Sequence, residues 1–88
     1  MKAIYKYMLH PYIKMSLPTG AEILSVAEQR ENIVVYALVN TTADDSESHE
    51  FVVLGTGHEA TRVTGFNFIG TVNLSKGALM FHVFHRKI

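Results

Sequence analysis

The stretch Ile33-Val34-Val35-Tyr36-Ala37-Leu38-Val39 decides the fold, because it is apolar or aromatic at every position and rich in β-branched side chains. Such side chains favour extended backbone. An apolar run without alternation is typical of a strand that is covered on both faces. We therefore predict that this stretch is the central strand of a sheet. The polar turn at residues 30–32 should pair it as a hairpin with the segment before it.

Working outward from this strand, short β-rich runs alternate with turn residues, and no window has a helical stripe of useful length. Pro11 separates the first two runs and suggests an edge strand or a bend, because proline cannot donate to a ladder. Residues 75–77 have the length and glycine placement of a hairpin loop. The other predicted strands span residues 2–9, 12–17, 50–54, 66–74 and 78–86.

Three segments are less regular. Residues 21–29 could form about two helical turns, and we favour a strand there. Residues 41–48 are polar and acidic, so we expect a mobile loop, because ordering it would bury little apolar surface. Residues 58–65 form a connecting segment with room for one short helical turn.

These elements predict an all-β protein of about seven short strands, arranged as a small antiparallel β-sandwich or a partly closed β-barrel. The chain has 88 residues, of which 48% are hydrophobic and 18% charged, the balance of a packed globular protein. A core divided in two at this length would leave each half too small to fold. We therefore expect a single β domain over residues 1–88.

Charge and composition exclude several classes of function. Eight basic and eight acidic residues give a formal net charge of zero, which argues against a binder of bulk nucleic acid. The chain has no cysteine, so it can form neither a disulfide nor a thiolate zinc site, and a cytoplasmic location is the default. No apolar run is long enough to cross a bilayer, and residues 1–7 lack a signal-peptide core, so we expect no membrane association.

Six blocks occur in an order and at a spacing that resemble a family of small, uncharacterised proteins encoded by tailed bacteriophages and prophages. The blocks are Lys2-Ala3-Ile4-Tyr5-Lys6-Tyr7, Leu17-Pro18-Thr19-Gly20-Ala21-Glu22-Ile23-Leu24-Ser25-Val26, Tyr36-Ala37-Leu38-Val39, Gly55-Thr56-Gly57-His58, Phe68-Ile69-Gly70-Thr71-Val72 and Phe81-His82-Val83-Phe84. The departures lie at residues 10–15 and in the acidic loop. The resemblance implies a phage accessory protein in the host bacterial cytoplasm, and it implies no catalytic residues.

The block Gly55-Thr56-Gly57-His58 is the first candidate for a site, because N–H groups in a glycine turn can form an anion-binding concavity. It lacks the Gly-Lys-Ser/Thr ending of a nucleotide-triphosphate loop. A β-turn that needs positive φ is the favoured alternative. Hydroxyl, imidazole and guanidinium groups nearby could contact phosphate or ribose. The predicted ligand-binding residues are Thr56, Gly57, His58, Arg62, His82 and Arg86.

The five histidines invite a metal interpretation, since imidazole is a common zinc ligand. His82 and His85 are three positions apart, however, and on a regular strand they point to opposite faces. A site would need His58 to join one of them across strands. We therefore predict no metal and no cofactor.

Nucleophilic catalysis has little support, because no serine lies in a nucleophile-elbow context. An acid/base pair of His58 and Glu59 is the basis of a weaker alternative, a nucleotide hydrolase. We predict that the protein is not an enzyme.

The function predicted from these observations is that of a phage accessory binding protein that neutralises a bacterial host or defence factor. It would sequester a small nucleotide signal or bind a defence protein, and we expect a homo-oligomer because the apolar content is high for so small a chain. The alternative is a structural or assembly accessory of the virion. Specific nucleic-acid binding through a barrel face is a third, weaker possibility, since the neutral charge disfavours it.

Overall fold

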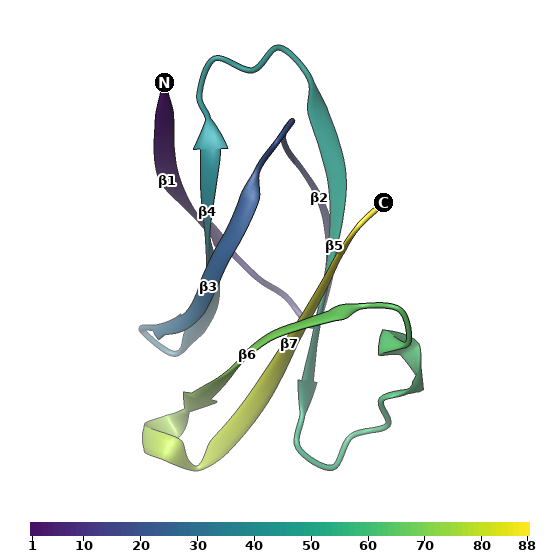
Figure 1. Cartoon of the computed structure of the whole chain (residues 1–88). Helices are drawn as coiled ribbons and strands as arrows, with labels where there is room; N and C mark the ends of the chain where they lie inside the picture. The colour runs from purple at the N-terminus through teal and green to yellow at the C-terminus, as the bar shows by residue number, and fades with distance from the viewer.

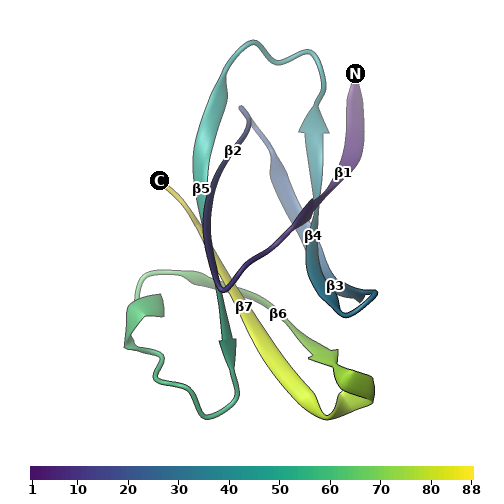
Figure 2. The same ribbon diagram turned by 180° about the vertical axis from the view of Figure 1, so that it is seen from behind.

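The computed structural model describes residues Met1–Ile88 and consists of two antiparallel sheets that face one another (Figures 1 and 2). Sheet A has the strand order β1-β4-β3, formed by β1 (Lys2–Met8), β4 (Asn32–Asn40) and β3 (Glu22–Gln29). Sheet B has the order β2-β5-β7-β6, formed by β2 (Tyr12–Pro18), β5 (Ser46–Gly55), β7 (Leu79–Lys87) and β6 (Asn67–Leu74). The predicted all-β class and seven strands are confirmed, as a small sandwich without a closed barrel.

The core lies between the sheets and is organised by β4. The residues of β4 that face inward are Ile33, Val35, Ala37 and Val39, and all of them are buried. Two of these, Ile33 and Val35, form a cluster with Phe51, Val72 and Val83 of sheet B. The prediction of a central strand in hairpin with the preceding segment is therefore confirmed, because β4 lies between β1 and β3 and pairs with both.

The outer face of β4 differs from the sequence prediction. Besides its two neighbours in sheet A, β4 contacts β2 of the facing sheet, so no other layer of the chain covers its outer side. Val34 is buried there among side chains of its own sheet, while Tyr36 and Leu38 are half-buried. We expected β4 to be covered on both faces. The facing sheet covers its inner face, so the expectation is correct there and wrong for the outer face.

Strand pairing also confirms one assignment and corrects one boundary. Residues 21–29 do form a strand, with a bulge between Ile23 and Ser25. The acidic loop predicted at residues 41–48 is shorter, because β5 already begins at Ser46. Ser46 pairs with Pro18 and Ser48 with Ser16, so hydrogen bonding to β2 orders a segment that has no apolar pattern of its own.

The turns agree with their sequence signals. Arg30 and Glu31 have φ values of 52° and 65°, as a tight two-residue hairpin turn requires. The short helical turn expected within residues 58–65 is η1 (Thr61–Val63), and the last hairpin closes through η2 (Ser75–Gly77). The structure contains no helix with the length and apolar character needed to cross a membrane.

Candidate functional site

A pocket of about 320 Å³ opens between the two sheets, at the end where the β3–β4 turn meets η2. The Ser75 N–H donates a hydrogen bond of 2.7 Å to Glu31 Oε1 and so joins these two turns. We call this cavity the end pocket. Its apolar lining consists of Leu9, Pro11, Ile33, Val53, Leu74 and Phe81, and its more polar positions are His10, Glu31, Asn32, Gly55 and His58.

The chain crossing from β1 to β2 forms one wall of the end pocket. Leu9 N–H donates to Ile33 O at 2.9 Å, and Val53 N–H donates to Pro11 O at 2.9 Å. Residues 9–11 are thus anchored to both sheets. Proline suits this position, because its fixed φ and missing N–H fit a crossing that leaves one ladder before joining the next.

His58 is held at the end pocket by a turn that requires glycine. His58 N–H donates to Gly55 O at 3.1 Å, and Gly57 has a φ of 89° at the third turn position, as a type II turn demands. Gly55 N–H also donates to His58 Nδ1 at 3.1 Å. In the neutral imidazole the proton therefore sits on Nε2, which is left as the donor of the ring.

Gly55 is needed for a second reason, which is close packing. A Cβ atom at this position would lie 2.8 Å from His58 Cε1, far inside van der Waals contact. The absence of a side chain at Gly55 thus allows the imidazole of His58 to fold back over the backbone.

The backbone of this turn does not form an anion cradle. The N–H groups of Gly55 and His58 are used within the turn, and Thr56 N–H donates to Met80 O at 3.2 Å. A nest would need successive N–H groups that converge on a ligand. The loop is thus a β-turn with positive φ, and the engagement of these three N–H groups within the chain argues against the phosphate cradle.

His82 and Thr56 do come together, but outside the end pocket. They lie on the outer side of sheet B, where His82 Nε2 is 2.7 Å from Thr56 Oγ1. The other ring nitrogen of His82 is 3.0 Å from Thr71 Oγ1 on β6. Both nitrogens of His82 are thus engaged with hydroxyls, and the ring ties the β5 turn to the edge strand.

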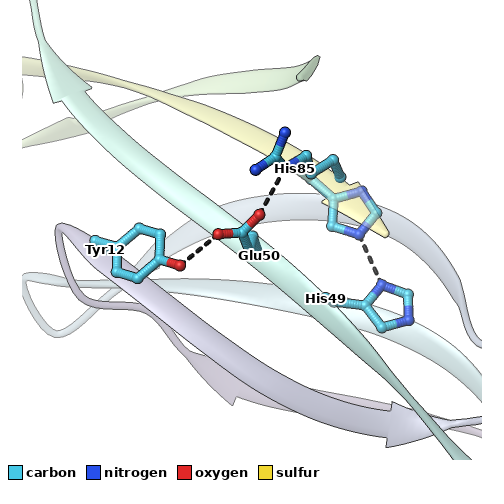
Figure 3. A network of polar contacts seen from close by, with 5 residues as sticks. Tyr12, His49, Glu50 and His85 are labelled. Carbon is cyan, nitrogen blue, oxygen red and sulfur yellow. Dashed lines mark hydrogen bonds and ion pairs between the residues drawn. The ribbon is translucent and has the colours of Figure 1, made fainter. Parts of the chain in front are cut away.

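The two arginines of the predicted set flank a different group on sheet B. Arg86 Nε pairs with Glu50 Oε1 at 2.5 Å, and the Tyr12 hydroxyl donates to the other carboxylate oxygen (Figure 3). Arg62 lies over the Tyr12 ring, 5.4 Å from its centroid, and Arg86 lies 4.5 Å from the centroid of Phe66. We call Tyr12, Glu50, Arg62, Phe66 and Arg86 the arginine cluster.

The electrostatics of the arginine cluster favour an ion pair over acid/base chemistry. Hydrogen bonds from Tyr12 and Arg86 lower the pKa of Glu50. The same hydrogen bond to Glu50 raises the pKa of Tyr12. Glu50 is therefore an anion at neutral pH and Tyr12 stays protonated, so neither group is poised as a general base.

The structure places the six predicted residues in three separate places. His58 borders the end pocket, with Gly57 at the tip of the same turn. Thr56 and His82 form a hydrogen-bonded pair behind it. Arg86 lies four residues beyond His82 along β7, about 13 Å away at the usual rise of a strand, beside Arg62. The predicted set is thus not one surface.

Sequence reasoning missed His10, Glu31 and Asn32 at the end pocket. His10 lies in the segment where the resemblance to phage proteins fails, and Glu31 and Asn32 read as an ordinary polar turn. Glu31 and Asn32 line the pocket because the β3–β4 turn lies against η2. No local sequence pattern predicts that contact. No three side chains of His, Asp or Glu lie close enough together to hold a metal ion.

Fold and site together define a small two-sheet β-domain with a pocket between the ends of its sheets. The chain belongs to the family described as Domain of unknown function (DUF7352), whose model matches residues 1–88. Comparisons with curated proteins and with solved structures find no match. The family description carries no host or virus, so the resemblance to phage proteins stays a prediction.

Proposed function

We propose that this protein is a non-enzymatic binding protein whose end pocket receives the base of a small nucleotide. In the phage setting that the sequence suggests, it would act in the host bacterial cytoplasm and sequester a nucleotide signal made by a defence system. The observation that carries the proposal is the end pocket itself, an apolar cavity with a few polar groups at its rim. That combination is typical of small-molecule sites.

The lining favours a flat, uncharged ring. Ile33, Leu74 and Phe81 supply apolar surface from three strands. The rim offers an Nε2 donor on His58 and the carboxylate acceptor of Glu31. A nucleobase presents ring acceptors and exocyclic amines in one plane, so it can satisfy both kinds of group while its faces stay on apolar side chains.

The phosphate of such a ligand would remain outside the end pocket. No lysine or arginine lines the cavity, and Glu31 would repel an anion placed inside it. Arg30 and Lys76 lie in the two turns that meet at the rim, and neither belongs to the two ion pairs of the structure. They are the cations available to a phosphate at the mouth.

A binder is favoured over a hydrolase by the surroundings of Glu59. Its carboxylate accepts hydrogen bonds from the backbone and the hydroxyl of Thr61, which lower its pKa, while His58 Nδ1 is occupied by Gly55. The adjacent His58 and Glu59 are thus each engaged elsewhere, which argues against the acid/base pair that a nucleotide hydrolase would use.

The test is a thermal-shift titration with adenosine, guanosine, their monophosphates and cyclic dinucleotides. A ligand selective for the native state must raise the melting temperature. We expect a rise with at least one of these compounds, and its loss in Leu74→Trp, which fills the end pocket. His82→Ala, a change of a histidine outside the pocket, should keep the response. A panel without any shift would reject the proposal.

A second candidate function is direct binding of a partner protein through the arginine cluster and its neighbours. Phe68 is 59% exposed and packs edge to face on Phe84, next to the stacked Arg62 and Arg86. Arginine and aromatic side chains are enriched at interface hot spots. The partner would be a host defence protein or, in the virion-assembly alternative, a head or tail protein.

Pull-down from host lysate with wild type and with Arg62→Ala/Phe68→Ala distinguishes this second candidate. A host protein retained by wild type and lost from the variant would favour direct inhibition. Detection of the chain in purified virions would favour the assembly role. Retention of the same proteins by both forms would reject this surface.

A further inference from the structure

The outer face of sheet A is a largely apolar surface that no part of the chain covers. Its side chains form three rows across β1, β4 and β3, given by the strand register. The rows are Ile4-Leu38-Glu22, Lys6-Tyr36-Ser25 and Met8-Val34-Ala27. Ile4 and Met8 are 61% and 52% exposed.

We propose that this face binds the same face of a second copy of the chain, with a two-fold axis parallel to β4. The second copy supplies the missing layer over Val34, Tyr36 and Leu38. It thereby accounts for a central strand that is apolar on both sides while the single chain covers one of them. The inference concerns a surface apart from the end pocket and does not rest on nucleotide binding.

Charge decides how the two copies are oriented. The face carries two cations on β1, Lys2 and Lys6, and one anion at a corner, Glu22. A two-fold axis across the strands would place Lys6 directly over the partner's Lys6. Like charges opposed in this way destabilise an interface, so this arrangement is disfavoured.

An axis parallel to β4 gives complementary contacts instead. It lays β1 of one copy over β3 of the other, so Ile4 faces Glu22, Lys6 faces Ser25 and Met8 faces Ala27. Glu22 then lies one row from both Lys2 and Lys6, within reach of their long side chains. In the single chain Lys6 Nζ donates to Gln29 Oε1 at 2.6 Å, which leaves its charge without an acidic partner. An isologous pair forms each of these contacts twice.

Native mass measured over a range from about 5 μM to about 500 μM tests the proposal, because mass action makes self-association depend on concentration. Wild type should reach twice the chain mass of 9.9 kDa. Met8→Lys should remain at the single-chain mass, because it places a charge over an alanine of the second copy. Ile88→Lys is the control, since Ile88 is also an exposed apolar residue but lies at the end of the chain, and it should behave as wild type.

The charge exchange Lys6→Glu/Glu22→Lys tests the orientation. Each single change brings like charges together across the proposed interface and should leave the chain at the single-chain mass, whereas the double variant restores an opposite-charge pair and should recover the doubled mass at the higher concentrations. Wild type that stays at the single-chain mass would overturn the proposal. Single variants that keep the doubled mass, or a double variant that stays monomeric, would overturn it equally.

Cross-linking provides a readout that does not depend on charge. The chain has no cysteine, so Leu38→Cys, in the central strand beside the proposed axis, introduces a single thiol. Facing sheets lie about 10 Å apart, beyond the reach of a disulfide, so a bis-maleimide of about that span is the cross-linker. One thiol in each chain can join only two copies, and we expect more covalent dimer from Leu38→Cys than from the control Ile88→Cys. Equal yields from the two variants would contradict the interface.

Discussion

His49 and His85 lie side by side on β5 and β7, with His49 Nδ1 2.8 Å from His85 Nε2 (Figure 3). Their rings are nearly parallel, with 20° between the ring planes and 5.1 Å between the centroids, and His49 is only 2% exposed. One nitrogen must donate and the other accept, so the pair is suited to two neutral rings. The buried Nε2 of His49 has no hydrogen-bond partner, which adds to the cost of charging it.

This pair predicts that the protein loses stability in mildly acidic solution. Burial lowers the pKa of both rings, that of His85 to about 4. Unfolded histidine binds a proton near pH 6.5, so between about pH 6.5 and about pH 4 the unfolded chain holds more protons than the native one. The free energy of unfolding should therefore fall as the pH is lowered through this window.

Urea unfolding at a series of pH values from about 7.5 to about 5 measures this effect. This pH range lies above the values at which carboxylates titrate. The double variant His49→Leu/His85→Leu should show a flatter dependence. Equal slopes for the two proteins would show that another group is responsible. His82→Ala, which removes a histidine on the outer side of sheet B, serves as the control and should keep the slope of wild type.

Glu50→Gln should lower the melting temperature more than Glu47→Gln does. Glu50 is buried between Arg86 and the Tyr12 hydroxyl, whereas the contact of Glu47 with Lys87 is a longer one, at 3.4 Å, near the surface. Glu50→Gln weakens two charge-assisted hydrogen bonds of a buried carboxylate at once, although Arg86 itself is half-exposed, while exposed pairs contribute little. Differential scanning calorimetry of the two variants compares them directly, and equal melting temperatures would contradict this ranking.

Gly55→Ala should displace His58 without breaking the turn. The new Cβ would collide with the imidazole at 2.8 Å, but the φ of Gly55 is not positive, so the backbone accepts alanine. Gly57→Ala has open space around it and a φ of 89°, so it should cost about 1 kcal/mol of stability through backbone strain. Imidazole NMR shifts report the ring position. We expect a large change at His58 in Gly55→Ala and a smaller one in Gly57→Ala.

Phe51 and Phe68 should respond to truncation to very different extents. Phe51 is fully buried in the core and packs against His85, so Phe51→Leu should cost about 1–2 kcal/mol. Phe68 is largely exposed on the edge strand β6, and Phe68→Leu should cost less than about 0.5 kcal/mol. Urea unfolding measures both. A larger loss at Phe68 would mean that its surface is covered in solution.

The end pocket shows why the candidate site was only partly predictable. His58 could be identified from the sequence because it follows a Gly-rich turn within β-forming sequence. Such a turn is formed by neighbouring residues, so its signal is local. Glu31 and Ser75, whose contact shapes the rim, are 44 positions apart. Neither residue has a periodic or compositional signature. Hairpin turns contain the same kinds of polar residue whether they contact another turn or only solvent.

Local chemistry determined the elements. The unbroken apolar run of β4, the polar turn before it and the glycine at η2 specify strand, turn and hairpin, because side-chain alternation and backbone φ are properties of adjacent residues. The choice between sandwich and closed barrel, the partners of Tyr12 and His49, and the start of β5 at Ser46 depended on how distant strands pair. Strand pairing joins backbones through hydrogen bonds that are the same for every residue type, so tertiary packing alone decided which side chains became neighbours.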